Sequence, residues 1–251
     1  PWLIRFLRTG RPAAWAATYK ALHALNAPCA GLYRDMLGDR EWNALFRPTG
    51  ALHVWRDAAP DALAELADGL RAENGVAVET LDADGLRELE PALSRDYRRG
   101  LHFHGSGHVT SPLALTETLM RRAGMLGATV LAARVEAVEP ASDGVTLRTD
   151  GGSHGFDMAV IAAGIASRDL ARGLDLSLSL ASERGYHITV PGTSGGITRP
   201  VTDAASAFVA TPLDEGLRIV GIAEFDTPDA PADDRQSDKL VACARAMLPK
   251  A

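Results

Sequence analysis

The chain has 251 residues, of which 46% are hydrophobic and 23% charged, and its formal net charge is −6. This composition is typical of a soluble globular protein with one or two domains. It argues against a nucleic-acid partner, because the negative charge repels phosphate and the basic residues are scattered apart from short clusters such as 98–99 and 121–122.

The opening residues, 1–8, mix Trp, Leu and Phe with arginine. They are too few to span a bilayer and lack a signal-peptide cleavage pattern, so we expect a core or interface helix, with peripheral membrane association as the alternative. Two cysteines, Cys29 and Cys243, lie far apart without metal-ligand spacing. They predict structural thiols in a reducing compartment and a cytoplasmic protein, with the inner face of the membrane as the alternative location.

The first hundred residues predict helices interrupted by short strands. A strand is expected over 50–55, after a Pro-Thr-Gly turn. Leucines at helical spacing predict an amphipathic helix over 61–73, ended by Asn74 and Gly75. A short surface helix is expected over 81–90, before Pro91.

From Ser111 the pattern changes. Ser111 is a good N-cap and Pro112 suits the first helical position, so a helix is predicted up to Gly124. The residues from 158 to 163 are apolar without alternation, which predicts a strand buried on both faces in a sheet covered by helices. Other strands are expected over 128–131, 134–139 and 145–149 in the middle of the chain, and over 186–190, 207–210 and 217–225 in an antiparallel sheet, followed by a helix over 237–248.

Five short strings carry a resemblance to a known family. They are VIAAGIAS at 160–167, ERGYH at 183–187, GHVTSP at 107–112, RVEAV at 134–138 and RIVGIAEF at 218–225. In this order and spacing they resemble the central portion of the FAD-dependent D-amino-acid dehydrogenase and oxidase family, whose relatives include glycine oxidase and sarcosine oxidase.

The resemblance implies a mixed α/β fold. A truncated FAD/NAD(P)-binding Rossmann-like portion, residues 107–174, is expected to be interleaved with an antiparallel-sheet substrate domain built from 1–106 and 175–251. No G-x-G-x-x-G fingerprint occurs in the chain. The family's carboxy-terminal portion, with its substrate-carboxylate arginine, also has no counterpart, and the first residue is Pro1. We therefore expect an excised or incomplete segment that alone binds FAD weakly or not at all and is inactive.

The family roles fall on particular residues of this chain. The resemblance implies that the backbone of Val135 contacts the flavin nucleotide and that Ala162, Ala163 and Gly164 form a turn against it, because glycine allows close approach. His108 is expected to orient the loop beside the cofactor. The alternative for Gly164 is a simple turn after a buried strand.

The implied reaction is hydride transfer from a D-amino acid or related amine to flavin, giving an imino acid that hydrolyses to a keto acid. Candidates for the substrate wall are Tyr186, His187, Arg199 and Glu224. Tyr186 is otherwise a half-buried sheet aromatic, and only one of Tyr186 and His187 faces the pocket because they alternate. Arg199 and Glu224 are otherwise an ordinary surface pair. The amine and the electron acceptor stay open.

Two alternatives come from other classes. One is a flavin-free binding or interaction domain of the same fold. The other is a zinc-dependent hydrolase using His102, His104 and His108. Because no carboxylate or cysteine lies nearby in sequence to complete that set, we predict no metal.

Overall fold

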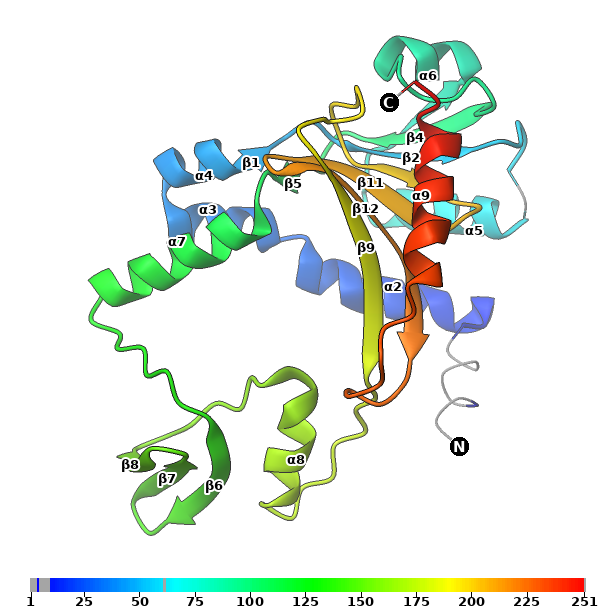
Figure 1. The fold of residues 1–251 in the computed structure, drawn as a ribbon. Helices are drawn as coiled ribbons and strands as arrows, with labels where there is room; N and C mark the ends of the chain where they lie inside the picture. Colours follow the sequence, from blue (N-terminus) through cyan, green and yellow to red (C-terminus); the bar gives the residue numbers. More distant parts are fainter. Residues whose placement is uncertain (1–3, 5–9, 61, 251) are drawn as a thin grey trace. The chain divides into compact units, whose positions relative to one another are not determined.

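A computed structural model describes residue 4 and residues 10–60 and 62–250. The predicted opening helix therefore lies outside the described residues, except for Ile4. The chain folds as two compact units (Figure 1): one comprises Pro1–Ala123, Tyr186–Ile222 and Asp233–Ala251, and the other comprises Gly124–Gly185 and Ala223–Ala232. Helices and strands occur in both, so the predicted mixed α/β class is confirmed.

The first unit is built on a seven-stranded sheet in the order β3-β4-β2-β10-β11-β12-β9. β10 pairs with β2 in parallel, whereas β4 is antiparallel to β2 and β3, and β11 is antiparallel to β10 and β12. The expected antiparallel sheet thus contains one parallel pair. The strands are β2 (Ala51–Trp55), β3 (Glu79–Asp82), β4 (Arg99–Phe103), β9 (Glu183–Pro191), β10 (Val201–Asp203), β11 (Phe208–Leu213) and β12 (Gly216–Phe225), of which β9 and β12 run across the unit boundary.

Helices and a small ribbon complete this unit. The two-stranded ribbon pairs β1 (Phe46–Arg47) with β5 (His108–Val109). The helices are α2 (Pro12–Asn26), α3 (Cys29–Leu37), α4 (Asp39–Leu45), α5 (Ala62–Glu73), α6 (Ala83–Leu89), α7 (Pro112–Met125) and α9 (Arg235–Met247).

One face of the large sheet holds the core. Leu52, Val201 and Ile219 have no exposed surface. They share this face because Val201 is the register partner of both Leu52 and Ala210, and Ala210 is the partner of Ile219. Helix α9 lies across the sheet in Figure 1 and contributes Leu240 and Met247, both fully buried. Burying such side chains contributes roughly 1.5–3 kcal/mol each, so this face supplies the main stability of the unit.

Local signals fixed several elements. The predicted helix over 61–73 is confirmed as α5, and it ends where the Asn74 side chain donates to the Leu70 carbonyl at 2.8 Å. Helix α6 begins later than expected, because residues 81–82 belong to β3 and the Asp82 carboxylate caps the backbone N–H groups of Asp84 and Gly85.

The second unit contains a three-stranded antiparallel sheet, followed by a 3-10 turn, η1 (Gly164–Ala166), and helix α8 (Ser167–Arg172). The strands over 134–139 and 145–149 are confirmed, whereas the strand over 128–131 is wrong, because residues 127–134 have no strand pairing. The third strand was not predicted. The sheet consists of β6 (Val135–Ala141), β7 (Gly144–Thr149) and β8 (Gly152–Phe156).

The predicted buried strand over 158–163 is also wrong. These residues lie outside every strand of the described chain, and Met158 and Val160 are 87% and 92% exposed. An apolar run becomes a buried strand only when neighbouring strands satisfy its backbone and helices cover it. No described segment does either.

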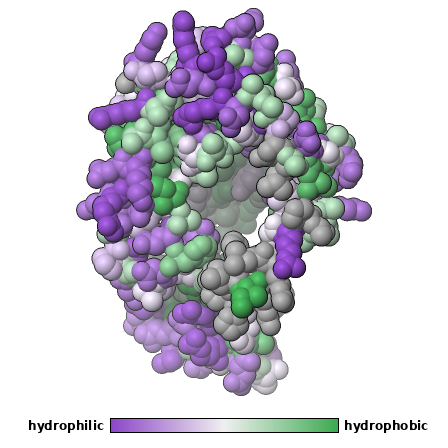
Figure 2. Space-filling model, turned by 90° about the vertical axis from the view of Figure 1, so that its right-hand side faces the viewer, coloured by the Kyte–Doolittle hydropathy of each residue, from purple (hydrophilic) through white to green (hydrophobic). Residues whose placement is uncertain are grey.

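The surface of the first unit is largely polar on the face in the upper part of Figure 2, where hydrophilic side chains gather. Among the described residues, no helix combines the length and apolar character needed to cross a membrane.

Candidate functional site

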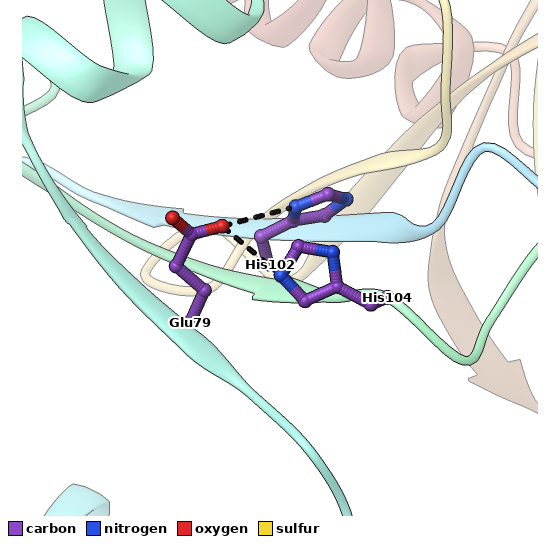
Figure 3. A group of neighbouring side chains, drawn as sticks. All are labelled: Glu79, His102 and His104. Carbon is purple, nitrogen blue, oxygen red and sulfur yellow. Dashed lines mark ion pairs between the residues drawn. The ribbon is translucent and has the colours of Figure 1, made fainter.

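A carboxylate and two imidazoles meet at the edge of the large sheet (Figure 3). Glu79 on β3 is the register partner of His102 on β4, and His104 follows two residues later on the same side of the chain. Glu79 Oε2 lies 3.6 Å from His102 Nδ1 and 3.0 Å from His104 Nε2. His102 is buried, whereas His104 and Glu79 are about half exposed, at 54% and 50% of their side chains.

Behind this cluster, Arg199 sets the tautomer of the His102 ring. Arg199 Nη1 lies 3.0 Å from His102 Nε2 and donates to the Thr49 carbonyl at 2.7 Å. A guanidinium can only donate, so Nε2 must accept, and the hydrogen-bond network places the proton of the neutral ring on Nδ1. That N–H points toward Glu79 and has no partner within hydrogen-bond distance in the described structure.

Glu90 holds Arg199 in place from the interior. Its carboxylate has no exposed surface and accepts from Arg199 Nε at 2.7 Å and from the Thr198 hydroxyl and N–H at 2.6 and 3.1 Å. A buried carboxylate is stable only when it is paired and hydrogen-bonded. The loop before β10 is therefore tied to the end of α6.

Gly50 completes the packing around His102. Its φ is +77°, and a Cβ built there would lie 2.3 Å from His102 Nε2. Only glycine fits this position without moving the ring.

The cluster of Glu79, His102 and His104 bears on the prediction that the chain binds no metal. No carboxylate lies near the histidines in sequence, but Glu79 reaches two of them from another strand, and the ligand atoms of Glu79, His102 and His104 lie within 4.8 Å of one another. However, a metal at His102 Nδ1 would leave its Nε2 proton facing the Arg199 donor. His108 lies outside the cluster, with its Nδ1 3.5 Å from Thr49 Oγ1. The arrangement is thus a carboxylate between two imidazoles, in which Glu79 and His104 are the two ligands readily available to a metal.

Three of the four predicted substrate residues, Tyr186, His187 and Arg199, lie in the first unit, and Glu224 lies in the second. The Tyr186 hydroxyl accepts from the Asp233 N–H at 3.0 Å, and the ring belongs to the buried core. His187 points to the other face of β9 and is exposed. Arg199 in the first unit forms an ion pair with Glu90, and Glu224 in the second unit lies 3.7 Å from Arg184.

The predicted cofactor residues, His108 excepted, lie in the second unit. Val135 begins β6 and pairs with Thr149. It lines an apolar slot over the small sheet together with Thr129, Leu131, Ala133, Leu147, Thr149, His154 and Phe156.

The turn that was expected to face the flavin stands open. Gly164 has φ +57°, and a Cβ built there would meet nothing within 4 Å. The Ala163 N–H is already engaged, because it donates to Ser167 Oγ at 3.0 Å. The positive φ fits the expected turn, but the described residues do not close a cradle around a nucleotide.

Burial lowers the pKa of His108, and the Arg47 guanidinium lowers it further, against the hydrogen bond to the Pro212 backbone. A neutral imidazole suits a residue that positions a loop rather than one that carries charge.

Sequence reasoning missed a second buried network. Asp203 has no exposed surface, and its Oδ2 accepts from Arg56 Nη1 and the Tyr97 hydroxyl, both at 2.7 Å. Burial would raise the pKa of Asp203, but the Ser206 N–H and these two donors hold it below its usual value. Burial and the bond to Asp203 raise the pKa of Tyr97. Every oxygen of Asp203 is occupied, so the network is structural, and no sequence pattern signals it.

His53 lies on the opposite face of the sheet from the core. Its ring packs 4.8 Å from that of Phe103. Burial, followed by the nearby Arg71 charge, lowers the pKa of His53 to about 4. The ring is therefore neutral at physiological pH and acts as an aromatic filler.

Comparison with known families shows to which family the chain belongs. The sequence matches the model of the DAO family, described as FAD dependent oxidoreductase, over residues 3–251. The chain belongs to this FAD-dependent oxidoreductase family. The family resemblance noted in the sequence is thereby confirmed.

Curated members of the family are similar along nearly the whole chain. A D-amino-acid oxidase of Bradyrhizobium diazoefficiens is 27% identical over 252 residues, which cover 100% of this chain and 60% of that protein. D-amino acid dehydrogenase 2 of Ralstonia nicotianae is 30% identical over 226 residues, covering 82% of this chain and 51% of that protein. The chain thus spans between half and two thirds of the length of these relatives.

Solved structures share the fold. Glycine oxidase from Bacillus cereus aligns with a TM-score of 0.73 at 19% identity, covering 95% of this chain and 64% of that one. L-proline dehydrogenase from P. horikoshii aligns with a TM-score of 0.72 at 16% identity, covering 88% and 62%. At these identities the likeness establishes the FAD-dependent oxidase fold alone.

Proposed function

We propose that this chain is the central portion of an FAD-dependent enzyme that oxidatively deaminates a D-amino acid or a related amine to an imino acid and then a keto acid. The observation that carries the proposal is the family match along residues 3–251, with relatives named D-amino-acid oxidase and D-amino acid dehydrogenase. Bound FAD would supply the hydride acceptor, and the protein would orient the substrate.

We further propose that these 251 residues alone bind FAD weakly or not at all and are inactive. Gly164 stands in open space, and the apolar residues before it are solvent-exposed, so neither side of the expected nucleotide turn is enclosed. An absorbance spectrum of the purified chain after FAD addition and gel filtration should show no stoichiometric flavin. A yellow protein with one flavin per chain would overturn this part.

On the substrate side, the proposal keeps Tyr186, His187, Arg199 and Glu224 as candidates and ranks them by the structure. His187 is exposed on the sheet face opposite the core, which leaves its ring accessible. Arg199 and Tyr186 are engaged in buried contacts, so they would act by positioning the loop before β10 and strand β9.

The reaction is tested on the polypeptide encoded by the complete reading frame. After FAD is added, D-alanine or D-proline should bleach the flavin absorbance without oxygen, and ammonia should be released from D-alanine. A protein that binds FAD but is reduced by neither D-amino acids nor secondary amines would refute the proposed activity. Reoxidation with oxygen or with a quinone would then separate an oxidase from a dehydrogenase.

The second candidate is a flavin-free binding or interaction domain of the same fold. The open surroundings of Gly164 favour it. The same spectrum decides, because this candidate predicts a complete polypeptide that stays colourless with excess FAD.

We also propose a reducing, cytoplasmic compartment. Cys29 and Cys243 are both free thiols in the structure, as expected for a protein that is not stabilised by disulfides.

A further inference from the structure

Residues 176–182, which connect α8 to β9 (Figure 1), have the sequence pattern of a strand without being part of one. Leucines at 176, 178 and 180 alternate with serines at 177 and 179. Strict alternation of apolar and polar residues is typical of a strand with one buried face. In the described structure, however, this segment belongs to none of the three sheets.

The leucines of the 176–182 segment are open to solvent. Leu176 is 57% exposed, and Leu178 and Leu180 are each 42% exposed. Every residue from 175 to 181 is exposed, so the described structure does not bury the segment. The Leu180 N–H donates to the Leu178 carbonyl at 3.0 Å, a short turn of the kind found at strand ends, which strand pairing would replace. An exposed run with an apolar side is a template for pairing with another strand.

The order of residues 176–180 indicates which strand fits. Leu-Ser-Leu-Ser-Leu reads the same in both directions. When two copies pair in antiparallel orientation around Leu178, Leu176 therefore lies opposite Leu180, and each serine lies opposite a serine. All the leucines of both copies then share one side of the pair, and no charged residue lies within it. Such a pair has two-fold symmetry, the commonest symmetry of soluble oligomers.

The ends of the pair are compatible in charge. Glu183 follows the segment and is exposed, and this register brings it opposite Gly173 of the other copy, next to Arg172. The Arg172 side chain is 71% exposed at the end of α8, where it lies 3.2 Å from Asp169. A carboxylate from one copy therefore approaches a guanidinium of the other at each end of the pair, which favours this orientation.

We propose that the 176–182 segment is a self-association strand, through which two copies of the chain pair in antiparallel orientation about Leu178. The contact is short, and interfaces that bury less than about 1,200 Å² are typical of weak, reversible complexes. The dimer should therefore dissociate on dilution. The inference does not depend on FAD or on the proposed reaction.

Analytical ultracentrifugation over a range of protein concentrations measures this association. The wild-type chain should pass from monomer to dimer as its concentration rises. Leu178→Lys places two like charges opposite each other at the two-fold axis and removes an apolar contact, so it should weaken association at least about tenfold. Leu126→Lys is the matched control, because Leu126 is an 89% exposed leucine of the same unit outside the segment, and this variant should associate like the wild type.

Disulfide cross-linking tests the register. Leu178→Cys should cross-link to itself under mild oxidation, because paired residues of antiparallel strands have Cβ atoms about 4.5–5.5 Å apart. A mixture of Leu176→Cys and Leu180→Cys should cross-link faster than either variant alone, since these two positions lie opposite each other only between copies. The wild type gives the background from Cys29 and Cys243.

Circular dichroism of each variant checks folding, and Leu178→Ser, which should weaken association without adding charge, replaces the lysine variant if that variant is misfolded. Any of four results would overturn the proposal. The first two are a wild-type monomer at every concentration and association that the Leu178 variants leave unchanged. The others are cross-linking with no preference for the mixed pair, and a polypeptide from the complete reading frame that stays monomeric at concentrations where the 251-residue chain dimerises.

Discussion

Replacing Arg199 by methionine tests whether the buried ion pair holds the first unit together. Methionine keeps much of the aliphatic volume but removes the guanidinium. Glu90 would then keep only its bonds from Thr198, with its carboxylate still fully buried. His102 Nε2 and the Thr49 carbonyl would also lose a donor.

The expected loss is large because a buried charge is left uncompensated. Removing one partner of a buried pair typically costs about 3–5 kcal/mol. The remaining bonds from Thr198 place the Arg199→Met value near the lower end, at about 3 kcal/mol. Glu90→Gln in the same background should recover part of that loss, since the unpaired charge is removed as well.

Urea unfolding followed by circular dichroism measures the change in unfolding free energy. Arg87→Met is the matched control: Arg87 bonds Asp84 at 2.6 Å on the surface of α6, with side-chain exposures of 38% and 92%. That substitution should cost less than about 1 kcal/mol. If Arg199→Met proved as mild as the control, the idea that Glu90 depends on Arg199 would have to be abandoned.

Three further predictions concern protonation, backbone and metal. The folded pKa of His53 is about 4, below its ordinary value, so its contribution to stability is present above pH 6.5 and is lost as pH falls toward 4. His53→Phe should remove up to about 3 kcal/mol of that loss, as measured by unfolding at a series of pH values. Parallel curves of unfolding free energy against pH for the variant and the wild type would contradict this. Gly50→Ala should destabilise the protein by at least about 1 kcal/mol more than Gly75→Ala. Both glycines have positive φ, but only at Gly50 would the added Cβ meet a neighbour, His102 Nε2 at 2.3 Å. Equal melting temperatures of the two variants would count against this. Zinc should leave the melting temperature unchanged, since His102 carries its proton toward Glu79; stoichiometric zinc in a dialysed sample would show that the tautomer is wrong.

Sequence predicted the elements whose signals are local. Helix α5 has its apolar spacing and its stop within 15 residues, and strand β2 follows a recognisable turn, so both formed as expected. The apolar run before Gly164 carried an equally clear local signal and failed. Its burial depends on neighbouring strands and helices, which no pattern inside the run can specify.

The candidate site shows the same limit. The two histidines could be placed on one face of a strand from their spacing, but Glu79 joins them from another strand through a register that sequence alone does not give. Glu90 looked like the polar end of a surface helix, yet it is fully buried because Arg199 arrives from a distant loop. Long-range ion pairs of this kind produce no periodic pattern in the sequence.

The parallel pairing of β2 with β10 sets the order of events during synthesis. Leu52 on β2 can pair with Val201 only after Val201, about 150 residues later, has been synthesised. At a translation rate of 5–20 residues per second this delay is roughly 8–30 s. Throughout that interval one edge of β2 offers unpaired backbone to any passing strand. Nascent chains of this protein should therefore depend on chaperones until β10 has left the ribosome.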